Sequence, residues 1–101
     1  MIKDITVGEF EGLDKKGHII LELSATWCTN CKQLEPELED VANELSNKAI
    51  FYKISIDDDL DFATKLGVSN LPTLLVFADG EKKKAISGYH DAEELLDLIA
   101  L

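Results

Sequence analysis

Two cysteines, Cys28 and Cys31, are separated by two residues and are the only cysteines among the 101 residues of the chain. A thiolate attacks disulfides, and a second thiol nearby can displace the mixed disulfide that results. A crosslink across so short a loop would restrict the unfolded chain very little, which argues against a purely stabilising bridge. The pair therefore predicts a redox-active disulfide.

The cysteines stand where a strand gives way to a helix. His18–Ser24 is a nearly continuous apolar run, typical of a central strand, and residues 29–46 have apolar side chains at helical spacing, with Pro36 expected to kink the helix. Unpaired N–H groups and the helix dipole should favour an anionic, exposed sulfur at Cys28. Cys31 lies one turn further on, less exposed and within reach. We expect Cys28 to be the nucleophile and Cys31 the resolving thiol.

Turn signals divide the rest of the chain into short elements. Strands are predicted over residues 2–7, 50–56 and 82–87 and over Thr73–Ala78, the last two in the chain joined as a hairpin across an Asp-Gly turn. Helices are predicted over residues 8–15, over residues 60–66 and from Asp91 onwards. In the last helix Asp91 and Glu94 form a capping-box-like pair, and the residues expected to face the core are Leu95, Leu98 and Ile99.

The order of these elements is β-α-β-α-β-α-β-β-α. Strand–helix–strand units imply parallel pairing through right-handed crossovers, and the late hairpin adds antiparallel strands. The sequence therefore predicts one α/β domain over residues 1–101, with a mixed five-stranded sheet covered by helices on both faces.

A longer pattern surrounds the cysteines. The segment Ala25-Thr26-Trp27-Cys28-Thr29-Asn30-Cys31-Lys32 follows a strand, Pro36 lies inside the next helix, and Leu71-Pro72-Thr73 precedes a later strand. Together, over almost the whole chain, these features resemble the thioredoxin family. The resemblance implies the thioredoxin fold and a thiol–disulfide oxidoreductase that reduces protein disulfides. It also implies a thioredoxin-reductase-type electron donor and no bound cofactor besides the Cys28–Cys31 disulfide.

A carboxylate in the central strand is a candidate for proton transfer. Glu22 lies among apolar neighbours, so burial should raise its pKa towards values useful for acid–base chemistry. In thioredoxins the matching position carries a buried aspartate thought to relay protons to the resolving cysteine, and Lys53 resembles the lysine that partners this acid. The alternative is that both side chains reach water at a strand end.

Pro72 resembles the cis-proline of the family, which lies beside the disulfide and lets the backbone of the preceding residue, here Leu71, pair with an extended substrate. An ordinary trans proline at the start of an edge strand is the alternative. The resemblance implies a flat contact surface around Cys28 that recognises protein backbones. Its members would be Trp27, Thr29, Asn30, Leu71, Pro72 and Gly88.

The sequence departs from the family at two places. Thr29-Asn30 stands between the cysteines, where typical thioredoxins have Gly-Pro, and Ser24 stands where a second tryptophan is usual. We expect a less reducing potential, because losing proline loosens the turn and Thr29 or Asn30 can donate a hydrogen bond to the thiolate.

Composition narrows the set of partners. The net charge of -10 repels nucleic acid and anionic lipid surfaces, and no apolar run reaches the length of a membrane span. The acidic start of the chain does not resemble a secretory signal, so we expect the protein to stay in a reducing cytoplasm. We also expect a monomer.

Other candidate sites have simpler explanations. His18 and His90 lack the spacing of zinc ligands, so no metal site is expected. The acidic run at residues 57–61 lacks the glycine and final glutamate of a calcium loop and is better explained as a helix N-terminus. Three lysines at residues 82–84 should protect an edge strand from aggregation.

Two other functions use the same fold. A binding module could hold a partner without turnover, but it would not need the resolving thiol Cys31. A disulfide oxidase or isomerase is disfavoured by the absence of an export signal. We therefore expect a protein-disulfide reductase.

Overall fold

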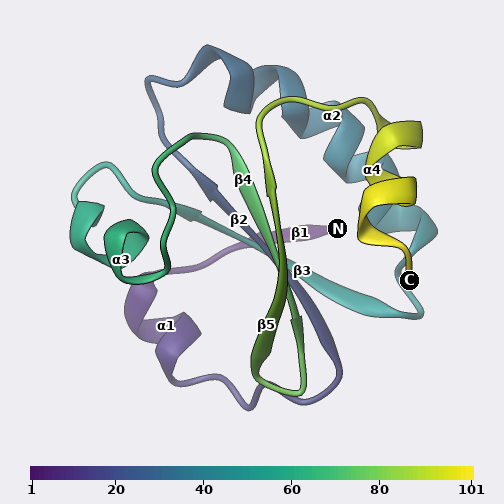
Figure 1. Ribbon diagram of the computed structural model, residues 1–101, viewed down its shortest axis with the longest axis horizontal. Helices are drawn as coiled ribbons and strands as arrows, with labels where there is room; N and C mark the ends of the chain where they lie inside the picture. Colours follow the sequence, from purple (N-terminus) through teal and green to yellow (C-terminus); the bar gives the residue numbers. More distant parts are fainter.

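Strands and helices alternate along the whole chain, as Figure 1 shows for the computed structural model, which describes residues 1–101. The predicted order of elements is confirmed, with most boundaries within two residues of the prediction. In chain order the elements are β1 (Ile2–Asp4), α1 (Val7–Glu11), β2 (His18–Ser24), α2 (Thr29–Glu44), β3 (Ala49–Ser55), α3 (Leu60–Lys65), β4 (Thr73–Ala78), β5 (Glu81–Ser87) and α4 (Ala92–Ile99).

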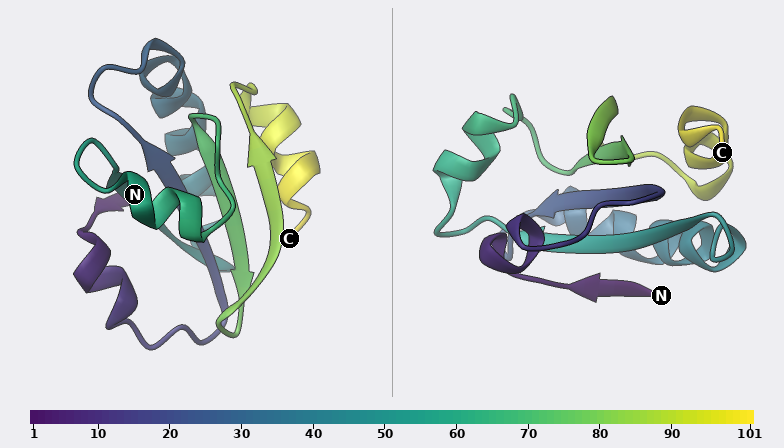
Figure 2. Two further views of the ribbon diagram at one scale, coloured as in Figure 1. Left: turned by 60° about the vertical axis from the view of Figure 1, so that its left-hand side comes forward. Right: turned by 90° about the horizontal axis from the view of Figure 1, so that it is seen from below.

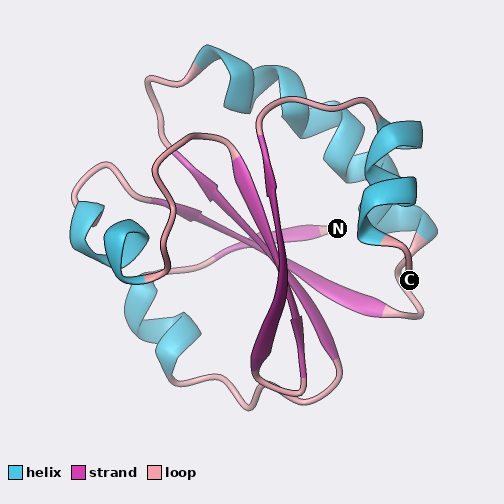
Figure 3. Ribbon diagram, in the orientation of Figure 1, coloured by secondary structure: helices cyan, strands magenta, loops and turns pink.

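The five strands form one mixed sheet in the order β1-β3-β2-β4-β5. β3 runs parallel to β1 and β2, whereas β4 is antiparallel to β2 and to β5. Figure 3 shows the strands crossing near the centre of the molecule and fanning out, as a twisted sheet must. β2 has a paired neighbour on each side and is buried after His18, which confirms it as the central strand.

Two helices cover each face of the sheet. α2 and α4 pack over a cluster that includes Ile20 and Leu95. α1 and α3 pack over a second cluster that includes Leu21 and Phe62. Both views in Figure 2 place α1 and α3 on the opposite side of the sheet from α4. Alternate residues of β2 therefore supply the two cores, because successive side chains of a strand point to opposite faces.

The first strand and the first helix are shorter than the sequence predicts. β1 ends at Asp4 instead of residue 7, and α1 spans Val7–Glu11 instead of residues 8–15. The Thr6 hydroxyl accepts from the Glu9 N–H at 3.0 Å, and the Glu9 carboxylate accepts from the Thr6 N–H at 2.9 Å. This capping box starts the helix and so ends the strand.

The C-terminal helix begins as predicted. The Asp91 carboxylate accepts from the Glu94 N–H at 2.9 Å, and the Glu94 carboxylate accepts from the Asp91 N–H at 3.1 Å. The prediction that Leu98 faces the core is wrong, because its side chain is 41% exposed. The helix turns a different stripe inward, and the leucines and isoleucine that pack on the core are Leu95, Leu96 and Ile99.

An extra residue in β5 changes the direction of its lysines. Val76 pairs with Lys84 and Phe77 with Lys82, so Lys83 is the added residue of a β-bulge. In a regular strand Lys82 and Lys84, which are two positions apart, would project from the same face of the sheet. The bulge lets them reach helices on opposite faces.

Lys82 and Lys84 each donate to the carbonyl end of a helix. The Lys82 amine donates to the Leu66 carbonyl at 2.9 Å, where α3 ends. The Lys84 amine donates to the carbonyls of Leu98 and Ile99 at 3.1 and 3.0 Å, in the last turn of α4. These carbonyls lack intrahelical partners, and the helix dipole favours a cation there. β5 is the edge strand that the sequence predicts, and two of its lysines also cap helices.

We expect Lys84→Gln to lower the free energy of unfolding by about 0.5–1 kcal/mol, because it removes a cation from a helix C-terminus. The matched control is Lys83→Gln, since the Lys83 amine contacts only the exposed Glu81 carboxylate at 3.2 Å. Urea denaturation at neutral pH measures both variants. If both variants lost the same free energy of unfolding, the contact between Lys84 and the end of α4 would contribute nothing beyond the removal of one positive charge.

Candidate functional site

Cys28 occupies the N-cap position of α2. Its backbone is extended, with φ -92° and ψ 111°, and its side chain takes the acceptor place that Ser or Asp fills in other helices. The Cys31 N–H donates to the Cys28 sulfur at 3.2 Å. No acidic residue lies in the first turn to compete for the positive end of the helix. The helix start is therefore arranged to stabilise negative charge on this sulfur.

The two thiols differ in burial. Both cysteines are free; Cys28 is 8% exposed and Cys31 is 1% exposed. Cys28 is more covered than the sequence predicts, because Ala25 and Leu71 pack around the pair. Burial raises the pKa of Cys31 to about 11, and a hydrogen bond with the Cys28 side chain adds to the rise. Cys31 therefore has to lose a proton to a base before it can attack.

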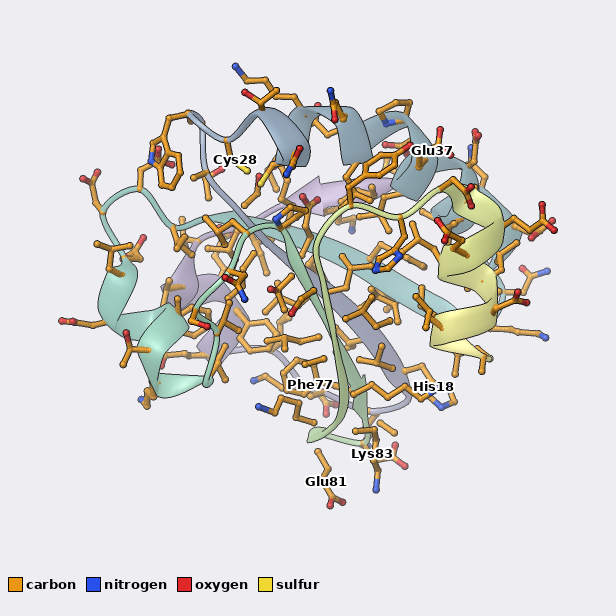
Figure 4. All side chains as sticks on the ribbon, turned by 45° about the horizontal axis from the view of Figure 1, so that its top comes forward. His18, Cys28, Glu37, Phe77, Glu81 and Lys83 are labelled. Atoms are coloured by element: carbon orange, nitrogen blue, oxygen red, sulfur yellow. The ribbon has the colours of Figure 1, made fainter.

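A groove of about 500 Å³ opens beside Cys28. Figure 4 shows this cysteine at the opposite end of the molecule from Glu81 and Lys83. Trp27 and Leu60 line this groove and are 68% and 61% exposed, so two large apolar side chains face water here. The sequence predicts Trp27 but not the contribution of α3, because only folding brings that helix next to the cysteines. The main apolar residues that line the groove are Trp27, Ile56, Leu60, Val68 and Leu71.

The Leu71–Pro72 peptide bond is cis, and β4, which follows it, is an interior strand. The alternative of a trans proline that starts an edge strand is therefore wrong. The Pro72 carbonyl accepts from the Gly88 N–H at 2.8 Å, and Gly88 has a φ of +84° that favours glycine. Leu71 packs against the cysteines and lines the groove, and the hydrogen bond joins Pro72, its neighbour in the chain, to Gly88.

The residues between the cysteines lie on the surface. Thr29 and Asn30 are exposed, and neither side chain donates to the Cys28 sulfur, whose donor is the Cys31 backbone N–H. The hydrogen bond that the sequence allows for them is absent.

The loop before Cys28 is fixed by an aspartate. The Asp57 carboxylate accepts from the Thr26 N–H at 3.1 Å and from the Thr26 hydroxyl, a hydrogen bond that lowers the pKa of Asp57. The acidic run is partly a helix N-terminus, as predicted, since Asp59 is the N-cap of α3, but Asp59 forms no capping hydrogen bond with its side chain. Sequence reasoning misses the bond between Asp57 and Thr26, which joins two loops far apart in the chain.

Glu22 is buried without a partner. It is 1% exposed, and neither of its carboxylate oxygens has a hydrogen-bond donor. Burial raises the pKa of Glu22 to about 7, and the charge of Lys53 opposes the rise. The predicted direction of the pKa shift is confirmed, and the alternative that Glu22 reaches water is wrong.

Lys53 is bound elsewhere, which corrects the predicted pairing with Glu22. Its amine lies 2.7 Å from the Glu35 carboxylate and 3.5 Å from the Asp4 carboxylate. Both partners are more exposed than Glu22, so pairing with them costs less desolvation. The sequence gives no signal for this choice, because the partners come from α2 and β1.

The structure shows no group of three or more His, Cys, Asp or Glu side chains placed to hold a metal ion. Figure 4 places His18 at the opposite end of the molecule from Cys28. None of the helices is both long enough and apolar enough to span a bilayer.

A family model described as thioredoxin matches residues 2–101 of the chain. The chain belongs to the thioredoxin family. It is 34% identical over 99 residues to the thioredoxin of Listeria monocytogenes, a match that covers 98% of this chain and 96% of that one. It is 33% identical over 98 residues to the thioredoxin of Staphylococcus epidermidis, covering 97% and 94%.

Solved thioredoxins have the same architecture. The thioredoxin of Malassezia sympodialis superposes with a TM-score of 0.85 at 25% identity, covering 99% of this chain and 89% of that one. Chloroplastic thioredoxin z gives a TM-score of 0.82 at 26% identity, covering 98% and 91%. The predicted thioredoxin fold is confirmed. So is the predicted class of activity, a thiol–disulfide oxidoreductase of the protein-disulfide reductase type.

Glu22 should make stability depend on pH. Its pKa is about 7 in the folded protein against an ordinary value of 4.5. The folded state therefore binds more protons between these values, and the free energy of unfolding falls as pH rises through this window. Glu22→Gln removes the titrating group. We expect the variant to gain up to about 3 kcal/mol relative to wild type between about pH 5 and about pH 8.

Urea denaturation across this pH range measures the gain. The control is Glu44→Gln, which replaces an exposed glutamate. A difference between Glu22→Gln and wild type that stays constant with pH would show that Glu22 is ionised in the folded protein throughout.

Proposed function

We propose that this member of the thioredoxin family reduces disulfides in proteins with Cys28 as the nucleophile and Cys31 as the resolving thiol. The observation that carries the assignment is the 3.2 Å hydrogen bond from the Cys31 N–H to the Cys28 sulfur at the start of α2. It supports an anion on Cys28 alone, since Cys31 is more buried and its pKa is raised to about 11. Two thiols with such different environments suit two different steps.

The exchange transfers two electrons in two displacements. The Cys28 thiolate attacks one sulfur of the substrate disulfide, a bond forms between them, and the other substrate sulfur leaves as a thiolate. Cys31 then loses its proton and attacks Cys28. The Cys28–Cys31 disulfide forms, the second substrate sulfur leaves as a thiolate, and the substrate is reduced while this protein is oxidised.

Glu22 is the proposed base for the second displacement. It lies on the face of β2 that α2 covers, and a carboxylate whose pKa is about 7 can both accept and release a proton near neutral pH. Its isolation from donors supports this role, because a carboxylate already bonded to a cation would be a weaker base. Lys53 influences Glu22 only through its charge.

The surface around Cys28 is the proposed substrate-binding site. The apolar groove could take a side chain next to the substrate disulfide, and the adjoining backbone could pair with an extended segment of the substrate. The proposed binding residues are Trp27, Thr29, Asn30, Leu71, Pro72 and Gly88.

A thioredoxin-reductase-type partner is the proposed electron donor, since the oxidised pair must receive two electrons before the next cycle. We place the protein in a reducing cytoplasm, where such a donor keeps thiols reduced, and we propose that it acts as a monomer without a bound cofactor. Its net charge of -10 argues against nucleic acid and anionic membranes as partners.

Replacing the resolving thiol should trap the intermediate. We expect Cys31→Ser to accumulate a mixed disulfide with insulin on Cys28, because no second thiol is left to release it, and turnover with dithiothreitol should fall to background. Mass spectrometry identifies the adduct and the turbidity of reduced insulin reports turnover. A stable adduct on Cys31 in Cys28→Ser, with none on Cys28 in Cys31→Ser, would reverse the roles. A wild-type rate equal to buffer would contradict the enzyme itself.

Removing the exposed indole should affect large substrates selectively. We expect Trp27→Ala to lower kcat/KM for insulin about tenfold, which corresponds to about 1.4 kcal/mol of lost binding in the transition state. The rate with dithiobis(nitrobenzoic acid), which is too small to fill the groove, should stay within about twofold. Leu98→Ala is the control, because Leu98 is also an exposed apolar residue but lies on α4. Equal losses with both substrates would place Trp27 in the chemical step instead.

A further inference from the structure

Three side chains from neighbouring strands form a row on one face of the sheet. Asp4 of β1 is in register with Lys53 of β3, and Lys53 is in register with Glu22 of β2. Parallel partners share a face, and neighbouring strands lie about 4.8 Å apart. Lys53 therefore stands between two carboxylates. On the other side of Glu22, β4 contributes the uncharged Leu74.

The Lys53 amine turns away from Glu22. It binds Asp4 at 3.5 Å and a fourth residue, Glu35 of α2, at 2.7 Å, whereas both oxygens of Glu22 lack a donor. The shorter contact, with Glu35, is the one hydrogen-bonded ion pair of this set. Glu35 therefore decides which way the amine points.

Lys53 has room to turn the other way. A pocket of about 190 Å³ is bounded by Glu22 and by Lys53 together with Glu35. The Lys53 side chain is 19% exposed, and its long stem can reorient. Without Glu35, the Lys53 amine would keep only the 3.5 Å contact with Asp4, whose side chain is 79% exposed, and Glu22 is the other carboxylate of the row.

We propose that Glu35 is a positioning residue for disulfide exchange: it holds Lys53 on the outer side of the pocket, which leaves Glu22 without a cationic partner and able to take the proton of Cys31. This inference rests on the proposed role of Glu22 as the base. A direct ion pair between Glu22 and Lys53 would stabilise the carboxylate and weaken it as a base.

Several charged groups surround Glu22, and their effects have to be separated. Asp4 comes from β1, Lys53 from β3, and Glu35 and Glu39 from α2, all of them bordering the same pocket. After burial, Lys53 lowers the pKa of Glu22, while the charges of Glu35 and Asp4 raise it. Loss of Glu35 could thus act through its own charge or through the release of Lys53. The experiment has to distinguish these two routes.

The test follows the Glu22 carboxyl group directly by carbon-13 NMR. Protein labelled at the glutamate carboxyl carbon is titrated from about pH 5 to about pH 9, reduced and oxidised, and Glu22→Gln assigns the resonance. We expect Glu35→Gln to lower the pKa of Glu22 by about 1. The matched control is Glu39→Gln, on the same helix and pocket, because Glu39 pairs with the N-terminal amine at 3.5 Å and not with Lys53. Its effect should be less than half as large.

The same titration in a Lys53→Met background separates the two routes. If Glu35 acts by holding Lys53, Glu35→Gln should lower the pKa of Glu22 less than half as much in this background as in wild type. Equal effects in both backgrounds would overturn the proposal, as would an unchanged Glu22 titration in Glu35→Gln.

Insulin reduction supplies a readout of the reaction itself. We expect the pH profile of the resolving step in Glu35→Gln to move to lower pH by the same amount as the NMR titration. A shifted titration with an unmoved pH profile would overturn the positioning role, because Glu22 would not be the base. Failure of the proposed function has a separate sign, the absence of insulin reduction by the wild-type protein.

Discussion

A single backbone N–H group, that of Cys31, connects this fold to its chemistry. It points at the Cys28 sulfur because α2 begins at Thr29, directly after the central strand and its short connecting loop. The buried face of α2 fixes the helix on the sheet, and the Asp57 carboxylate fixes the loop that leads to it. The mixed sheet, the helix and the loop therefore all serve to place one donor beside one sulfur.

Local patterns predict the elements of this molecule well, because each depends on nearby residues. The change from a continuous apolar run to helical spacing places the β2–α2 junction, and the Asp-Gly turn places the hairpin. Contacts between elements that are distant in the chain cannot be predicted from such local patterns. The pairing of Lys53 with Glu35, the part of α3 in the groove and the bulge at Lys83 depend on how separate elements meet. The pattern also fails to predict which side of α4 faces the core, because Leu96 and Leu98 both fit helical spacing with Leu95 and Ile99.

The burial of Glu22 sets the role proposed for it against the stability of this sheet. An apolar residue of similar size would pack in the same place without a desolvation cost. The strand keeps a carboxylate there without hydrogen bonds, beside the fully buried Leu74 of β4 on the same face of the sheet. Such an arrangement persists where the rest of the core supplies enough stability to compensate, as at many sites that perform chemistry.

An acidic segment runs from the connection after β3 into the first turn of α3, and its charge acts on approaching molecules before any contact forms. Asp57, Asp58, Asp59 and Asp61 have no basic partner within ion-pair distance, and Leu60 among them lines the groove beside Cys28. A negative potential at the entrance accelerates diffusional encounter with cationic proteins and slows it with anionic ones, and dissolved salt screens this effect over about 10 Å at 0.1 M. The rate of encounter with oxidised proteins should thus depend on their charge and on the ionic strength.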